Sequence, residues 1–221
     1  MARYRPIAML FSVLVPLSCN SPSLLIRRPD NTAIDYAVTS MWVDEIRASA
    51  RSGDWLLSRS FFLVSDVIST FTAGDGYSHI AIYDADTATV IEAIGADVRE
   101  VTLESFVSRT YHLLLVRPAG LSEDELRESV RRARSVLGVK FDQGGAFGFD
   151  DPDKLYCSEL LAWAIGANER GLDMGIVIAP SAMAQLGRAI YYSGKRTDSL
   201  VHELAMSRLL LPVSTPRATK W

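Results

Sequence analysis

SHIAIYDADTATVIEA, residues 78–93, is the stretch that decides the fold class of this chain. Its two β-rich runs, HIAIY and ATVIE, flank a polar turn, and this pattern predicts a β-hairpin. With the turn centred on residues 85–86, His79 lies directly opposite Glu92, and Ile80 lies opposite Ile91. Opposed residues of an antiparallel pair share a face, with Cβ atoms about 4.5–5.5 Å apart. The Glu92 carboxylate can therefore hold one imidazole nitrogen and leave the other free as a base, provided that the loop has an even length.

The second informative stretch surrounds Cys157. Asp153 is a candidate N-cap, which predicts a helix running to about Ile165 with Cys157 in its first turns. Apolar residues follow Cys157 at i+3, i+4 and i+7, namely Leu160, Leu161 and Ala164, so the thiol shares the inward stripe. The amides and dipole of a helix N-terminus favour a thiolate, and a nearby imidazolium favours it more strongly. The same amides could stabilise a tetrahedral oxyanion.

Working outward, the chain predicts strands first and helices after them. We expect a short helix over 40–49, a strand from Trp55, apolar residues at helical spacing over 61–71, and a strand over 111–116. Ser122 and Glu125 form a capping box that opens a helix to about Leu137, and a glycine-rich loop follows at 138–148. Pro180-Ser181 opens a short helix, and a strand is expected over 189–192. This order indicates an α+β fold rather than alternating βαβ units.

The composition excludes several classes of protein. The 221 residues carry 23 basic and 26 acidic side chains, with no basic cluster, so we expect no nucleic-acid partner. The two cysteines, Cys19 and Cys157, build no disulfide framework and no CxxC zinc motif. His202 begins HELAM, which lacks the second histidine of a zinc-protease helix. We therefore expect no metal and no organic cofactor.

The N-terminus has the pattern of an export signal. Arg3 and Arg5 precede a mostly apolar run over 7–17, and no acidic residue occurs before Asp30. Residues 1–19 are therefore predicted to be a signal segment, with Cys19 as a candidate lipid attachment point and hence a candidate membrane anchor, although Pro16 does not fit a lipoprotein signal well. A start at Met41 is the alternative. Residues 20–38 are expected to be a linker, and 39–221 a single catalytic domain with an unassigned C-terminal tail.

Several segments taken together resemble a known family. The segments SHIAIY (78–83), IEA (91–93) and YCSEL (156–160), with Gly53-Asp54 and Phe141-Asp142, are similar to the permuted members of the NlpC/P60 papain-like superfamily, and more narrowly to the YiiX/YebB-like permuted amidases. The order His, Glu, Cys is the permuted one. The resemblance covers about 44–180 and implies a circularly permuted papain-like fold, in which a small antiparallel sheet or half-barrel packs against helices.

The resemblance also implies the chemistry. Cys157 would be the nucleophile, His79 the base and Glu92 the group that orients the histidine, in hydrolysis of an amide through an acyl-enzyme. Tyr156 would lie beside the site, and Tyr77 and Asp54 are further candidates for substrate binding. Export and the superfamily suggest a peptidoglycan-derived peptide, and the permuted members suggest small N-acylated amino acids or lipids.

Two other functions, and a purely structural role for Cys157, are alternatives to this interpretation. A lone free cysteine is more often a small core residue than a nucleophile, and only its occurrence with His79 and Glu92 in papain-like order favours catalysis. Acyl transfer of the lecithin–retinol acyltransferase-like type would use the same thiol. A ligand-binding module on an inactivated papain-like fold would not need it. Asp54 could equally make a structural hydrogen bond at its strand start, and Tyr77 and Tyr156 could be packing residues.

Overall fold

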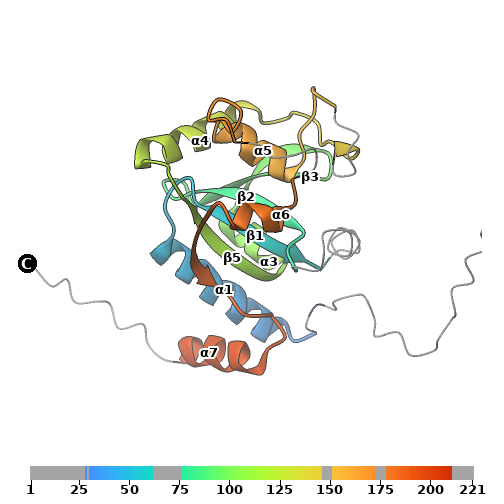
Figure 1. Cartoon of the computed structure of the whole chain (residues 1–221). Helices are drawn as coiled ribbons and strands as arrows, with labels where there is room; N and C mark the ends of the chain where they lie inside the picture. The colour runs from blue at the N-terminus through green and yellow to red at the C-terminus, as the bar shows by residue number, and fades with distance from the viewer. Residues whose placement is uncertain (1–27, 29, 62–75, 146–150, 173–177, 211–221) are drawn as a thin grey trace, which may run out of the picture.

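The computed structural model describes residues 28, 30–61, 76–145, 151–172 and 178–210, which form helices around one antiparallel sheet (Figure 1). The strands lie in the order β4-β3-β2-β1-β5-β6. They are β1 (Trp55–Ser60), β2 (His79–Asp84), β3 (Thr89–Ile94), β4 (Asp97–Thr102), β5 (Thr110–Pro118) and β6 (Gly187–Tyr192). The helices are α1 (Thr32–Ser49), α3 (Leu103–Ser108), α4 (Glu123–Ser135), α5 (Cys157–Ala164), α6 (Pro180–Ala184) and α7 (Ser199–Leu210). The predicted α+β class is confirmed.

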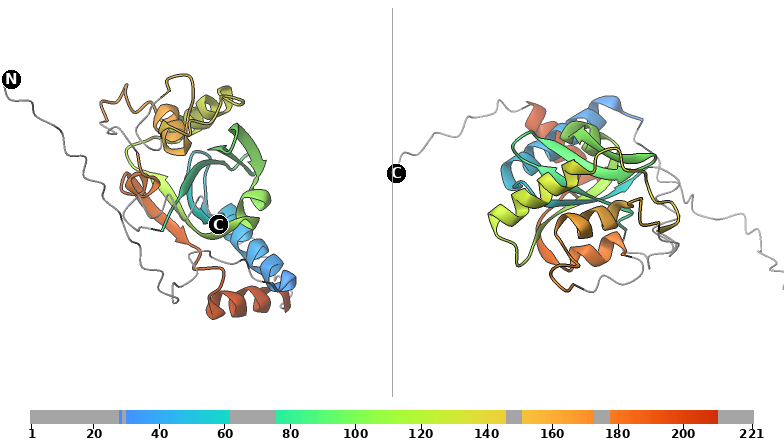
Figure 2. Two further views of the ribbon diagram at one scale, coloured as in Figure 1. Left: turned by 90° about the vertical axis from the view of Figure 1, so that its right-hand side faces the viewer. Right: turned by 90° about the horizontal axis from the view of Figure 1, so that it is seen from above.

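Helices cover both faces of the curved sheet (Figure 2). Helices α4, α5 and α6 lie on one face, over a core that includes Trp55, Ile80 and Leu161. Helices α1, α3 and α7 lie on the other face, over a second core that includes Trp42, Tyr83 and Phe106. Because side chains alternate along each strand, β2 supplies Ile80 and Ile82 to the first core and Ala81 and Tyr83 to the second.

The predicted linker over 20–38 is wrong in its last part, because α1 begins at Thr32. Asn31 caps this helix, with its side-chain oxygen accepting the N–H groups of Ala33 and Ile34. Val38, Met41 and Trp42 then follow at helical spacing and are buried. The polar cap residue made this segment resemble a linker, although a cap is where a buried helix starts.

The predicted hairpin forms, but its register differs from the prediction by two residues. Ile82 pairs with Ile91, and Asp84 pairs with Thr89, so the turn comprises residues 85–88. Asp84 explains the shift, because its buried carboxylate accepts hydrogen bonds from the Asp86 amide and the Thr87 hydroxyl. Ala88 completes the turn at φ 54°, in the left-handed region. A two-residue shift leaves every side chain on its predicted face.

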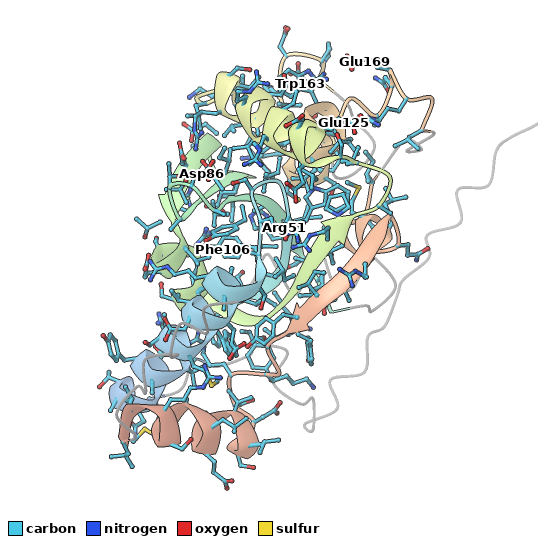
Figure 3. The ribbon with its side chains drawn as sticks, turned by 90° about the vertical axis from the view of Figure 1, so that its left-hand side faces the viewer. Arg51, Asp86, Phe106, Glu125, Trp163 and Glu169 are labelled. Atoms are coloured by element: carbon cyan, nitrogen blue, oxygen red, sulfur yellow. The ribbon has the colours of Figure 1, made fainter. Side chains whose placement is uncertain are left out.

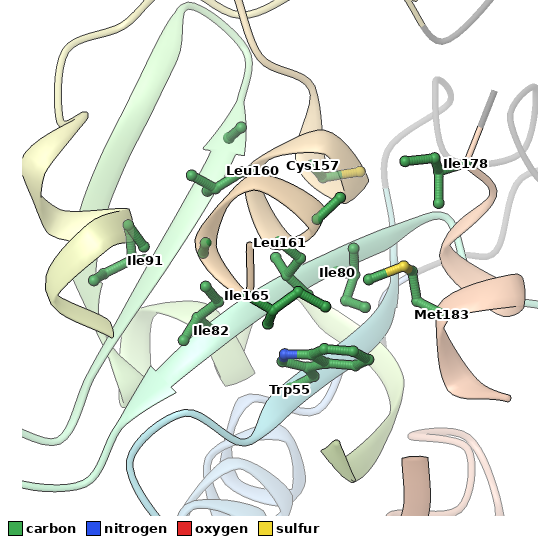
Figure 4. Close-up of a cluster of buried hydrophobic side chains, with 14 of the residues drawn as sticks. Trp55, Ile80, Ile82, Ile91, Cys157, Leu160, Leu161, Ile165, Ile178 and Met183 are labelled. Atoms are coloured by element: carbon green, nitrogen blue, oxygen red, sulfur yellow. The ribbon is translucent and has the colours of Figure 1, made fainter. Parts of the chain in front are cut away.

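Helix α5 begins at Cys157 and not near Asp153 as predicted. Asp153 lies in a turn and donates its amide to Asp151, while Leu155 bridges to Phe141 in an extended conformation. The N-cap is Tyr156, whose amide donates to the Glu159 carboxylate 3.0 Å away. The predicted buried stripe of Cys157, Leu160, Leu161 and Ala164 is confirmed, and Figure 4 shows Cys157 beside Leu160 and Leu161 over the sheet.

Most other elements agree with the sequence. The strands at Trp55 and over 111–116, the capped helix after Ser122, the helix at Pro180 and the strand over 189–192 are confirmed. Strand β4 and helices α3 and α7 were not predicted. The signal segment over 1–19, Gly148 and almost all of the apolar run over 61–71 lie outside the described residues. No helix among the residues described is both long enough and apolar enough to cross a membrane.

Candidate active site

The structure brings His79, Glu92 and Cys157 together. The imidazole Nε2 of His79 lies 2.9 Å from Oε2 of Glu92. The thiol of Cys157 hydrogen-bonds to the same imidazole, and since Nε2 faces Glu92, Nδ1 is the nitrogen left for sulfur. All three side chains are nearly or fully buried, with exposed fractions of 7% for His79, 0% for Glu92 and 8% for Cys157. This is the spatial relationship that nucleophile, base and orienting carboxylate require.

His79 and Cys157 approach each other at the start of β2, although they belong to opposite faces of the sheet. His79 is the first residue of β2 and shares the face of Ala81, whereas Cys157 packs in the opposite core with Ile80. The pairing of β3 with β2 begins only at Ile82, which leaves the amide of Ile80 near the sulfur of Cys157, where it lowers the pKa of the thiol. The imidazole and the thiol can therefore meet around the end of the strand.

Charge within the site favours an ion pair. Burial disfavours the imidazolium, but hydrogen bonds to Cys157 and Glu92 outweigh it and raise the pKa of His79 to about 9. Burial likewise opposes the thiolate, yet the hydrogen bond and charge of His79, with the Ile80 amide, lower the pKa of the Cys157 thiol. Glu92 is buried too, but His79 and Arg109 hold its pKa at about 2. These shifts all favour a thiolate–imidazolium pair beside an ionised Glu92 carboxylate.

Two arginines that the sequence did not single out bind the far oxygen of Glu92. Arg99 Nε donates to Oε1 at 3.0 Å, and Arg109 Nη2 donates to the same atom at 2.5 Å. Arg99 is the direct cross-strand neighbour of Glu92. Only a prediction of β4 could have shown this contact, and the position of Arg109 depends on α3, which the sequence analysis also missed.

The two tyrosines considered for substrate binding have structural contacts. Tyr156 is buried directly before Cys157, and its hydroxyl accepts the amide of Ile178 at 2.8 Å. The ring of Tyr77 meets the ring of His112 edge-on at 5.1 Å between centroids. Burial, with the nearby Tyr192, raises the pKa of Tyr77 to about 12, so its hydroxyl stays neutral. Both tyrosines border the site in sequence, and packing is the role that these contacts support.

Asp54, a further candidate for substrate binding, makes contacts that favour the structural role that the sequence also allowed. It is fully buried, and its carboxylate accepts Arg117 Nε at 2.9 Å and Arg117 Nη2 at 2.7 Å, together with the Arg51 amide. It lies beside Tyr83, at the end of β2 far from His79. A rise of about 3.3 Å per residue separates the two positions by about 13 Å along the strand.

The candidate lipid attachment point, Cys19, lies outside the described residues. Among those that the structure does describe, no cluster of three or more His, Cys, Asp or Glu side chains could hold a metal ion. His79 and Glu92 hydrogen-bond to each other instead.

Comparison with known proteins identifies the family of this chain. The family model described as "Permuted papain-like amidase enzyme, YaeF/YiiX, C92 family" matches residues 49–174, more than half of the chain. Among solved structures, the chain is similar to the crystal structure of metalloprotein yiiX from Escherichia coli O157:H7. That match has 20% identity and a TM-score of 0.52, and it covers 65% of this chain and 97% of the other. The residues described here do not fit a metal centre of three or more such ligands.

A search of curated proteins found no match. The family match nevertheless spans all three residues of the site, and the structural match supports the permuted papain-like fold that the sequence predicted. The chain therefore belongs to the C92 family of permuted papain-like cysteine amidases.

Proposed function

We propose that this amidase hydrolyses its substrate through an acyl-enzyme on Cys157, with His79 as acid and base and Glu92 as the group that orients His79. One observation carries the proposal: a single buried imidazole hydrogen-bonds to both the Cys157 thiol and the Glu92 carboxylate. A cysteine that served only for packing would need neither the imidazole nor the Ile80 amide beside its sulfur.

The reaction follows from the protonation states. The thiolate attacks the amide carbonyl carbon, and the oxyanion forms near the first amides of α5. The imidazolium gives its proton to the leaving nitrogen, so the C–N bond breaks, an amine departs and a thioester remains. Neutral His79 then removes a proton from water, whose oxygen attacks the thioester. Carboxylic acid is released, and the proton returns the site to its starting ion pair.

The substrate class is part of the proposal. The signal-like segment over 1–19 supports export, and Cys19 within it supports attachment to a membrane through a lipid. An exported thiol amidase would meet cell-wall peptides and N-acylated amino acids or lipids. We therefore propose a small amide of one of these kinds as substrate.

The test compares the full-length enzyme with its Cys157→Ala variant on mixed muropeptides and on N-acyl amino acids. The reaction is run in ¹⁸O-labelled water and followed by mass spectrometry. Hydrolysis predicts one labelled oxygen in the acid product of the wild type and no product from the variant. Equal cleavage by both proteins would remove Cys157 from the mechanism.

The two alternatives have their own signatures in this experiment. Unlabelled acyl groups on an added amine or lipid hydroxyl would show a transferase and overturn the hydrolytic proposal. Binding of these compounds without turnover, together with an unreactive thiol, would show a ligand-binding module.

A further inference from the structure

The two oxygens of the Glu92 carboxylate have different partners. Oε2 faces His79, while Oε1 accepts from both Arg99 and Arg109. The carboxylate is fully buried, so none of these bonds is exchanged for water. A buried carboxylate is stable only when it is paired and hydrogen-bonded, and here one oxygen is held so that the other can hold the imidazole.

The two arginines differ in how firmly they are placed. Arg99 projects from β4, and its side chain is 46% exposed. Arg109 follows the last turn of α3, and its side chain is only 18% exposed. The guanidinium carbon of Arg109 lies 5.1 Å from the centroid of the Phe106 ring. The side chain of Arg109 is therefore more restricted in its position next to Glu92 than that of Arg99.

Helix α3 links this arginine to the histidine. The Phe106 ring, labelled in Figure 3, is buried, and its centroid lies 6.2 Å from that of His79. Thr102 caps the helix by accepting the amide of Ser105. Phe106 thus touches both His79 and Arg109, and one short helix fixes both ends of the His79–Glu92 pair.

We propose that Arg109, assisted by Arg99, is a positioning residue of the amidase reaction: it fixes the Glu92 carboxylate so that Glu92 can orient His79 toward the Cys157 thiol. This inference rests on the proposed function. A misplacement of about 1 Å in such a constellation can cost about 100-fold in rate. Arg109 touches neither the reacting atoms nor the thiol, so its whole effect passes through Glu92.

The test uses Arg109→Met, Arg109→Lys and Arg99→Met, with Arg127→Met as control. Arg127 lies on α4 in an exposed pair with Glu123. Two readouts are taken over pH: the rate of Cys157 alkylation by iodoacetamide, measured with Cys19→Ser in every protein, and the kcat and KM of amide hydrolysis. The alkylation readout needs no substrate.

For Arg109→Met we expect a 10- to 100-fold lower kcat with KM nearly unchanged. The acid limb of both pH profiles should move to higher pH, because the pKa of Glu92 rises without Arg109 and a protonated Glu92 no longer stabilises the imidazolium that favours the thiolate. Arg109→Lys should recover part of kcat and the acid limb, and Arg99→Met should show a smaller loss. In a Glu92→Gln background, Arg109→Met should have little further effect on kcat, since both changes act through one carboxylate.

An unchanged acid limb and an unchanged kcat in Arg109→Met, with only lower stability, would overturn the inference and leave a structural ion pair. A full additional loss of kcat in the Glu92→Gln background would also overturn it. If the wild type hydrolyses no amide, the proposed function fails, but a shift of the alkylation profile in Arg109→Met would still support positioning through Glu92.

Discussion

Oε2 of Glu92 lies 2.9 Å from Nε2 of His79, and both side chains are buried at the open end of the β2–β3 hairpin. Arg99 and Arg109 donate to the other oxygen, Oε1, which leaves Oε2 to accept a hydrogen bond from His79. This bond fixes the proton on Nε2 and leaves Nδ1 as the acceptor for the thiol proton. In the proposed mechanism the base is therefore oriented before any substrate binds.

Glu92→Gln is expected to lower kcat by about 100- to 10,000-fold, because the amide can donate to Nε2 and so move the ring proton to Nδ1. Nδ1 would then be unable to accept the thiol proton. Amide hydrolysis under saturating substrate measures the loss, with Glu104→Gln as a control at an exposed carboxylate. A Glu92→Gln enzyme with wild-type kcat would show that the carboxylate does not orient the base.

Alkylation of Cys157 should be fast well below the pH at which an ordinary thiol ionises. Since the pKa of the thiol is lowered and that of His79 is raised to about 9, the thiolate–imidazolium pair exists between these two values. The rate should rise through the lowered thiol pKa and change again only near pH 9. The measurement is the iodoacetamide rate in Cys19→Ser protein from acid to alkaline pH. In His79→Ala the rise should move to higher pH, and an unmoved rise would contradict the ion pair.

Asp54→Asn should reduce stability without changing the chemistry. It breaks a buried two-point contact with Arg117 and leaves a guanidinium poorly paired, a loss of about 3–5 kcal/mol. Urea unfolding measures it, and Glu123→Gln, which removes an exposed pair with Arg51, should cost at most about 1 kcal/mol. The kcat/KM of the folded variant should stay near the wild-type value. A large rise in KM would instead show that Asp54 contributes to substrate binding.

Arg196→Met should loosen the packing of the C-terminal region against α1. The guanidinium is fully buried, donates to Asp35 and Thr39 of α1, and lies 4.6 Å from the ring centroid of Trp42. Removing it takes a donor from the Thr110 and Val107 carbonyl oxygens and leaves the Asp35 carboxylate with Arg28 as its remaining cation, at a cost of about 3–5 kcal/mol. Arg208→Met is the matched control, because Arg208 joins α7 to Glu45 of α1 in a largely exposed pair worth at most about 1 kcal/mol. Equal losses in the two variants, measured by urea unfolding, would contradict this account.

Much of the candidate site was predictable because its determinants are local. Alternation along 79–92 puts His79 and Glu92 on one face whatever the exact turn, so a register wrong by two residues still gave the correct pair. The apolar spacing after Cys157 likewise predicts an inward thiol, even though the N-cap is Tyr156, three residues after the predicted Asp153. The order His, Glu, Cys completes the resemblance to permuted papain-like amidases.

The sequence by itself therefore determined the hairpin with His79 and Glu92 on one face, the capped helix α4 and the inward face of α5, because hydrophobic period and capping act between near neighbours. Only the tertiary structure decided that Asp54 pairs with Arg117, that Arg99 and Arg109 share one oxygen of Glu92, and that the Cys157 thiol meets His79. These contacts join residues on different elements, and whether two such residues meet depends on how the strands and helices pack rather than on their spacing along the chain.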